Sequence, residues 1–271
     1  MTIVWVDPGD ALPDPACTPV PPSGLTAAGL DLSPGRLEEA YRKGLFPWYS
    51  PGEPVLWWSP DPRMVLRCAD LHVSRSLAKR IRQFDRDHTP GEPPSLCITL
   101  NLAFPEVIRQ CAQRGAQRIG LGAARAGQDW AAANEAQGRD GTWITPDIMA
   151  VYTAWHRLGR AHSVEAWVDG RLAGGLYGVN LGQCFFGESM FSLAADASKI
   201  ALAYLVRHLQ AHGLPWIDCQ QETPHLASLG ARPIPRTQFL EMLAAGRDAP
   251  APAWGRGRLR ADGRLQPATS G

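Results

Sequence analysis

The sequence lacks the cysteine spacings that build zinc sites and redox motifs. Its six cysteines include no C-x-x-C pair and are spread along the chain at Cys17, Cys68, Cys97, Cys111, Cys184 and Cys219. The seven histidines are not grouped with acidic residues at ligand spacing. We therefore expect no metal site, and scattered thiols favour a reduced, cytoplasmic setting.

Long apolar runs are missing too. No stretch approaches the roughly 18–20 apolar residues that a membrane span needs, and no basic start precedes an apolar run. We expect neither a signal peptide nor a membrane partner. Apolar residues make up 45% and charged residues 20% of the 271 positions, an ordinary globular mix. The expectation is a folded protein with a real core, by default a monomer.

The chain also lacks an excess of charge. The formal net charge is +1, so composition gives no global signal for nucleic acid. Basic residues are nevertheless concentrated locally, against only Asp70 and Asp85, at Arg63, Arg67, Arg75, Lys79, Arg80, Arg82 and Arg86. Such a patch is either a solvated helix face or a phosphate-binding surface, and charge alone does not choose between them.

The chain begins with an arm over residues 1–32 that is rich in Pro, Asp and Gly and is expected to be irregular. Ser33-Pro34 predicts a helix start, because Ser caps free N–H groups and Pro fits the first turn, and Gly44 ends the helix. The prolines between 46 and 63 favour short strands and rigid turns. Residues 74–84 predict a basic helix with Leu77 and Ile81 inward.

Residues 71–250 carry a longer alternation of elements. We predict a helix from Thr145-Pro146 to Gly159, strands at 163–168, 172–179 and 183–188 with an Asp169-Gly170 hairpin turn, a helix at 198–211, a strand at 215–220, and helices near 224–229 and 238–245. This order favours an α/β (α+β) fold with a GNAT-like acyltransferase domain, by analogy of fold. Residues 112–140 are interpreted as a surface insertion and 251–271 as a loose tail.

Three polar residues fall where buried strands are expected: Glu188, Asp218 and Gln220. Alternation places Asp218 and Gln220 on one face of their strand. Buried polar groups need partners, so an internal hydrogen-bond network explains them without any function. The functional reading is a site at a strand end, where a carboxylate and an amide orient a reacting amine.

Six motifs, in order, resemble the leucyl/phenylalanyl-tRNA–protein transferase family: 44–52 (GLFPWYSPG), 56–63 (LWWSPDPR), 141–145 (GTWIT), 162–165 (HSVE), 187–192 (GESMFS) and 217–220 (IDCQ). The resemblance runs from about residue 25 to 243. The 112–140 segment departs from it, being longer than the family pattern leads us to expect. The resemblance implies transfer of Leu or Phe, and less readily Met, from aminoacyl-tRNA to an N-terminal Arg or Lys of acceptor proteins, which marks them for degradation, without a coenzyme.

The resemblance also implies a smaller N-terminal α+β domain, which we assign to residues 1–70, before the acyltransferase-like domain. It implies residue roles as well. Glu188 matches the acid that holds the α-amino group of the aminoacyl moiety, and Asp218 and Gln220 match the catalytic pair. The family's side-chain pocket matches Trp143, Leu176, Phe185 and Ile217, for which plain core packing is the alternative. Trp57 and Trp58 are candidates for stacking on the terminal adenine. The tRNA acceptor stem is expected on Arg63, Arg67, Arg75, Lys79, Arg80 and Arg82.

Two other classes of function stay open at this point. A coenzyme-A-dependent N-acetyltransferase needs a Gly-rich turn before its central helix to hold the pyrophosphate, and residues 189–198 contain no glycine. A module that only binds tRNA ends fits the basic patch and the tryptophans, but it does not require Asp218 and Gln220.

Overall fold

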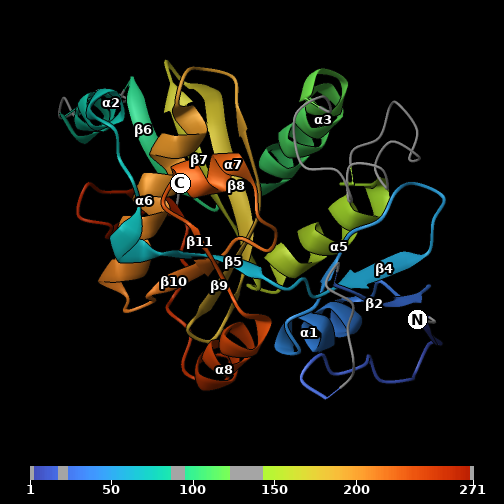
Figure 1. The fold of residues 1–271 in the computed structure, drawn as a ribbon. Coiled ribbons are helices and arrows are strands. Elements are labelled where there is room, and N and C mark those ends of the chain that lie inside the picture. Colours follow the sequence, from blue (N-terminus) through green and yellow to red (C-terminus); the bar gives the residue numbers. More distant parts are fainter. Residues whose placement is uncertain (1–2, 18–23, 87–94, 123–142, 269–271) are drawn as a thin grey trace.

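A computed structural model describes residues 3–17, 24–86, 95–122 and 143–268, and for residues 114–122 it describes the backbone alone. Within these ranges the strands form two sheets (Figure 1). The smaller has four strands, in the order β1 (Val4–Val6), β2 (Leu25–Gly29), β4 (Val55–Trp58) and β3 (Phe46–Pro47). The α1 helix (Pro34–Arg42) is capped by Ser33, whose side chain accepts a hydrogen bond from the Arg36 N–H, so the predicted helix start is confirmed.

The larger sheet has nine strands, and its middle is an antiparallel meander. The order is β11 (Arg232–Ile234), β5 (Arg63–Arg67), β10 (Trp216–Asp218), β9 (Cys184–Ser192), β8 (Arg171–Leu181), β7 (Ala161–Val168), β6 (Leu96–Leu100), β12 (Gly257–Leu259) and β13 (Leu265–Pro267). The Asp169-Gly170 turn has positive φ at both residues, as the hairpin prediction requires. β10 lies parallel to β9 and antiparallel to β5. The mixed α/β class is therefore confirmed.

Helices cover both faces of this sheet (Figure 1). The α2 (Arg75–Arg86) and α6 (Ala197–Ala211) helices pack on one face, with Leu77, Ile81 and Phe84 turned inward. On the other face lie α3 (Phe104–Gly122) and α5 (Pro146–Arg157), which share a core with α1. Shorter elements complete the fold: a 3₁₀ turn (Cys68–Asp70), α7 (Pro224–Ser228) and α8 (Arg236–Gly246).

Two expectations about organisation need correction. The tail after residue 250 is not loose, because β12 and β13 extend the large sheet along β6. β5 lies in the stretch assigned to the N-terminal domain, yet it pairs with β10 and β11 in the large sheet. Of the expected insertion at 112–140, residues up to Gly122 continue α3, and 123–140 lie outside the described residues. Within the described ranges, no helix combines the length and apolarity needed to span a bilayer.

Candidate active site

The site lies where β9 and β10 stop pairing. The last paired residues are Asp218 and Phe186, while β9 continues to Ser192. The register between β8 and β9 shifts here: Tyr177 faces Ser189 and Gly178 faces Gly187. Glu188 is therefore the extra residue of a β-bulge, a device that turns a side chain away from the regular alternation. The bulge needs Gly178, because a Cβ there would come within 2.3 Å of the Phe186 carbonyl oxygen.

Side chains from α1, from α5 and from the segment after β10 converge on the Glu188 carboxylate. The Tyr41 hydroxyl of α1 donates to Oε1 at 2.6 Å, and the Gln220 amide nitrogen donates to the same oxygen at 3.0 Å. The Tyr152 hydroxyl of α5 donates to Oε2 at 3.4 Å and lies 2.5 Å from the Tyr41 oxygen. Burial raises the pKa of Glu188 to about 7 despite these bonds. A half-buried carboxylate of this kind suits an ammonium group, which would replace the lost water.

The Asp218 carboxylate forms a fully buried ion pair with Arg63. Both its carboxylate and the Arg63 guanidinium have no exposed side-chain surface. Arg63 donates from Nε to Oδ1 at 2.8 Å and from Nη2 to Oδ2 at 2.6 Å, a bidentate pair. The Arg63 guanidinium lies over the Phe46 and Phe239 rings, 4.9 and 4.4 Å from their centroids. This enclosure keeps the ion pair dry and fixed.

Gln220 lies just beyond the β10 strand, in the left-handed region with a φ of 63°. The expected strand alternation with Asp218 is therefore wrong, because the backbone has already turned at Gln220. The two residues are nevertheless joined: the Gln220 N–H donates to Asp218 Oδ1 at 2.9 Å. Its carbonyl accepts from the Met64 N–H at 3.2 Å. The one remaining group is the side-chain oxygen, which has no hydrogen-bond partner among the described residues.

Sequence reasoning missed the tyrosines of this site. Tyr41 and Tyr152 lie on the buried faces of α1 and α5, where period alone does not separate a core ring from a ring whose hydroxyl reaches a carboxylate. Tyr177 was missed as well. Its buried hydroxyl has no partner among the described residues, and burial with the nearby Glu188 charge raises its pKa well above the usual value.

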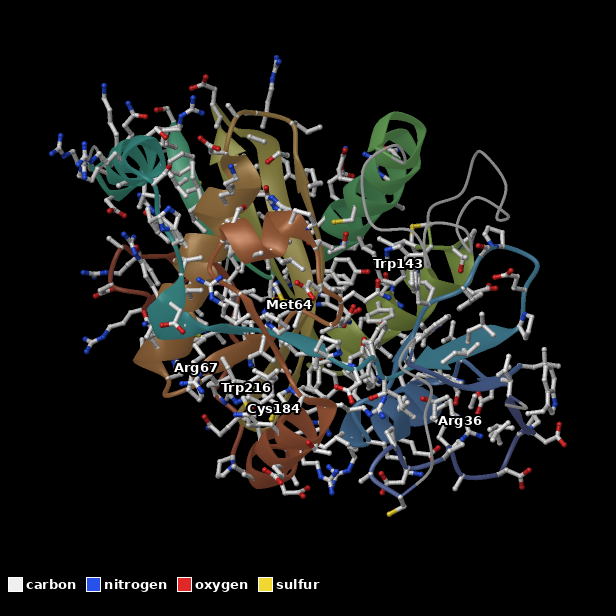
Figure 2. All side chains as sticks on the ribbon, in the orientation of Figure 1. Arg36, Met64, Arg67, Trp143, Cys184 and Trp216 are labelled. Carbon is white, nitrogen blue, oxygen red and sulfur yellow. The ribbon has the colours of Figure 1, made fainter. Side chains whose placement is uncertain are left out.

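The four residues expected to line the side-chain pocket do not share one environment. Leu176, Phe185 and Ile217 are buried in the core beneath α6. Trp143 packs, half-buried, against the core on the opposite face and is labelled near the start of α5 in Figure 2. Leu176 lies opposite Met190 across the β8–β9 ladder, two residues from Glu188.

The tryptophans of β4 differ in accessibility. Trp57 is 1% exposed and belongs to the core, so it has no free face for a base, contrary to expectation. Trp58 is half-buried and donates from its indole nitrogen to the Trp48 carbonyl at 2.7 Å. The Trp48 ring, which sequence reasoning passed over, is also half-buried and lies 5.6 Å from the Trp58 ring. Between residues 46 and 58, Trp48 and Trp58 thus offer a partly accessible aromatic pair, whereas Trp57 does not.

The basic patch is divided by burial. Arg63 is enclosed with Asp218 and cannot reach a phosphate, so its assignment to the tRNA surface is wrong. Arg80 is engaged, with Nη1 donating to the Ala195 carbonyl at 2.7 Å and Nε 3.5 Å from Asp196. Arg67, at the end of β5, is exposed. The other exposed cations recur at helical spacing along one face of α2: Arg75, Lys79, Arg82 and Arg86.

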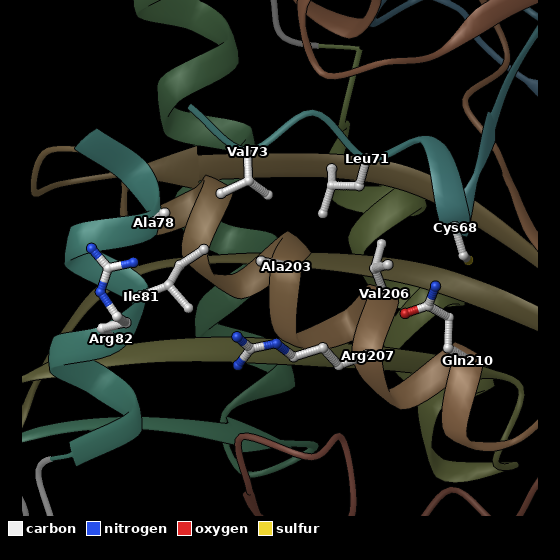
Figure 3. A pocket seen from close by; sticks show the side chains of 10 residues that line it. All are labelled: Cys68, Leu71, Val73, Ala78, Ile81, Arg82, Ala203, Val206, Arg207 and Gln210. Atoms are coloured by element: carbon white, nitrogen blue, oxygen red, sulfur yellow. The ribbon is translucent and has the colours of Figure 1, made fainter. Parts of the chain in front are cut away.

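Two cavities flank this basic face of α2. One, of about 310 Å³, lies between α2 and α6, and Figure 3 shows Arg82, Arg207 and Gln210 around it. The other, of about 440 Å³, includes Lys79 and Arg80. Neither includes Glu188, Asp218 or Gln220. Among the described residues, no group of His, Cys, Asp and Glu side chains is arranged to hold a metal ion.

Comparisons with known proteins give a consistent family. The model of the leucyl/phenylalanyl-tRNA protein transferase family matches residues 129–244, and the model of its N-terminal domain matches 30–61. A leucyl/phenylalanyl-tRNA–protein transferase of Bordetella petrii is 51% identical over 99% of this chain and 97% of its own length. One from Chromobacterium violaceum is 48% identical over 92% of this chain and 94% of its own. A solved GCN5-related N-acetyltransferase from Kribbella flavida is 13% identical, with a TM-score of 0.30 over 74% of this chain and 60% of its own.

Proposed function

Because this chain belongs to the leucyl/phenylalanyl-tRNA–protein transferase family, which moves Leu or Phe from aminoacyl-tRNA to proteins, we propose that its acceptors are proteins with an N-terminal Arg or Lys. Methionine is the third, weaker donor residue. The product then carries an apolar N-terminal residue that marks it for degradation. The observation that carries the proposal is the cluster of Glu188, Gln220 and Asp218 at the opening between β9 and β10.

Glu188 binds the α-ammonium group of the aminoacyl moiety. Its two oxygens already accept from Tyr41, Tyr152 and Gln220, so they are fixed in place before substrate arrives. These three donors are neutral, so an ammonium group supplies the counter-charge for the half-buried carboxylate. This anchoring leaves the ester carbonyl of the substrate near Gln220.

Gln220 orients the attacking amine. Its amide nitrogen donates to Glu188, and its side-chain oxygen meets no donor in the described part of the chain. An N–H of the acceptor's α-amine donates to that oxygen, which directs the nitrogen lone pair at the ester carbon. An amide is a poor base, so the contribution is orientation, which can supply about 7–11 kcal/mol at best.

The reaction exchanges an ester for an amide. The amine nitrogen bonds to the carbonyl carbon, the bond from that carbon to the ribose oxygen breaks, and the tRNA leaves with its hydroxyl restored. One proton leaves the attacking nitrogen and one reaches the ribose oxygen, so charge balances. The ester is already activated, and no coenzyme is needed to supply energy.

The donor's side chain and its tRNA are bound by neighbouring surfaces. Two of the four candidate pocket residues lie near the carboxylates: Leu176 pairs with Met190, two residues after Glu188, and Ile217 directly precedes Asp218. Methylene-sized differences in such a pocket are worth about 1–3 kcal/mol, which fits a site that accepts Leu, Phe and Met. Trp48 and Trp58 offer a stacking surface for the terminal adenine, and Arg67, Arg75, Lys79 and Arg82 bind acceptor-stem phosphates.

The test is transfer of labelled leucine from charged tRNA to peptides that differ only in their first residue. We expect transfer to peptides that begin with Arg or Lys and none to a peptide that begins with Asp. Glu188→Gln, folded and thermally stable, serves as the inactive control. Equal transfer to all three peptides would remove the acceptor rule. No transfer to any of them by the folded wild type would leave a protein that only binds tRNA ends.

A further inference from the structure

We infer that Arg63 is a positioning residue of the transfer reaction, and that Asp218 acts with it through the main chain of Gln220 rather than on the substrate. The inference rests on the proposed function for the role of Gln220. It assigns to Arg63, which lies more than one hundred and fifty positions from Asp218 in the chain, the task of holding the turn that presents the Gln220 amide.

The Asp218 carboxylate is occupied by protein donors and closed to substrate by its burial. Oδ1 accepts from Arg63 Nε and from the Gln220 N–H, at 2.8 and 2.9 Å. Oδ2 accepts from Arg63 Nη2 at 2.6 Å. The side chain has no exposed surface, so an attacking amine does not reach it. The contact through which Asp218 influences the reaction is therefore the Gln220 N–H.

That contact matters because Gln220 holds an unfavourable backbone conformation. A φ of 63° is the left-handed region, which a residue with a Cβ rarely adopts unless its surroundings hold it there. Two bonds hold it here: the Gln220 N–H to Asp218, and the Met64 N–H to the Gln220 carbonyl. Both partners flank Arg63 or pair with it. This backbone conformation directs the Gln220 side chain so that its Nε2 donates to the Glu188 carboxylate.

Arg63 is fixed by features that a lysine cannot reproduce. Besides its two bonds to Asp218, its Nη1 donates to the Gly44 carbonyl at 3.2 Å. Its planar face lies over the Phe46 and Phe239 rings. A lysine keeps the charge but loses the planar fork and the stacking. Arg63→Lys therefore leaves Asp218 with a cation and removes the geometry that orients it.

The experiment compares Arg63→Lys with Arg36→Lys. Arg36 is a matched control, because it is also buried and pairs with Asp31 at 3.3 Å and Glu39 at 2.6 Å, away from the site. For Arg63→Lys we expect the kcat of leucine transfer to fall at least tenfold. The Kd of a non-hydrolysable leucyl-adenosine amide should stay within threefold, because Glu188 keeps its tyrosines. Arg36→Lys should keep the wild-type kcat, whatever it does to stability.

A second readout does not depend on activity. In protein labelled with ¹⁵N-glutamine, hydrogen exchange of the Gln220 N–H reports the bond to Asp218, and Gln220→Glu identifies the signal by its loss. We expect faster exchange at this amide in Arg63→Lys and unchanged exchange in Arg36→Lys. Unchanged exchange in Arg63→Lys, or an equal loss of kcat in both variants, would overturn the inference. A wild type that transfers nothing while the exchange result holds would instead reject the proposed function.

Discussion

Arg63 is buried, whereas Arg75 and Arg82, less than twenty positions further along the chain, are exposed. The comparison separates two uses of charge in this protein. Arg63 is wholly enclosed, bidentate with Asp218 and sandwiched by two phenylalanine rings. Arg75 and Arg82 are exposed on one face of α2, without an ion pair to any described residue. Two enclosed charges are held in one fixed arrangement, and removing either leaves the other buried without a counter-charge. Exposed charges are screened by salt, and several of them together attract a charged partner. The first arrangement suits orientation at a reacting centre, and the second suits phosphates.

The sharpest way to break this comparison is to remove one enclosed charge. Asp218→Ala leaves Arg63 buried without a counter-charge, so we expect the free energy of unfolding to fall by about 3–5 kcal/mol. Urea denaturation measures it. Asp85→Ala is the control, because Asp85 pairs with Arg207 at 2.8 Å in a partly exposed setting. It should cost about 1 kcal/mol or less. Equal losses in the two variants would contradict the distinction.

The same contrast applies to the tryptophans. We expect Trp48→Ala to weaken binding of aminoacyl-tRNA by about 1–3 kcal/mol, the usual value of a stacking surface for one base. Trp57, 1% exposed, offers no such surface. Trp57→Phe should lower the melting temperature and leave the Kd unchanged. A filter-binding titration of both variants decides the matter, and a larger effect on Kd from Trp57→Phe would refute the assignment.

The exposed charges are tested together. In the triple variant Arg75→Gln, Lys79→Gln and Arg82→Gln we expect roughly tenfold weaker tRNA binding at moderate salt, because counterion release is reduced. The slope of log K against log salt should become shallower by about one for each phosphate that the protein no longer neutralises. A control triple with the same charge change, Arg157→Gln, Arg232→Gln and Arg264→Gln, uses exposed arginines elsewhere. The same slope in both triples would show that only net charge matters.

The smallest effect concerns Glu188, a half-buried carboxylate between the enclosed and the exposed charges. Burial raises its pKa from 4.5 to about 7, so ionisation rises about tenfold between pH 6 and 8. Relative to Glu188→Gln, the wild type should bind the leucyl-adenosine amide up to about tenfold more tightly at pH 8 than at pH 6. Calorimetric titration of both proteins across this range measures the ratio. A ratio that does not change with pH would contradict the role of the ionised carboxylate.

Glu188 also predicts how stability changes with pH. Between pH 4.5 and about pH 7, Glu188 is protonated to a greater extent in the folded state than in the unfolded state, because folding raises its pKa. The free energy of unfolding of the ligand-free wild type should therefore fall, relative to Glu188→Gln, as pH rises through this window. Urea denaturation at pH 5 and pH 8 gives the sign, and a relative gain in stability with pH would contradict it.

Much of the fold followed from local signals. Ser33-Pro34 and Thr145-Pro146 begin helices as expected, because capping and the first-turn proline act within a few residues. Asp169-Gly170 forms its hairpin for the same reason. The tail after residue 250 was misjudged, because its composition favours disorder and only the open edge of β6 gives Gly257–Leu259 a pairing partner.

The sequence by itself determined the element order, the family motifs and the candidates Glu188, Asp218 and Gln220, since each of these is written in local pattern. Only the tertiary structure decided which charges are enclosed. It joined Arg63 to Asp218 and Tyr41 to Glu188 across more than one hundred positions each, and it took Arg63 out of the basic patch. The physical reason is that burial and hydrogen-bond partners depend on which strands and helices pack together. Hydrophobic periodicity and composition are local properties, so they do not reveal that packing.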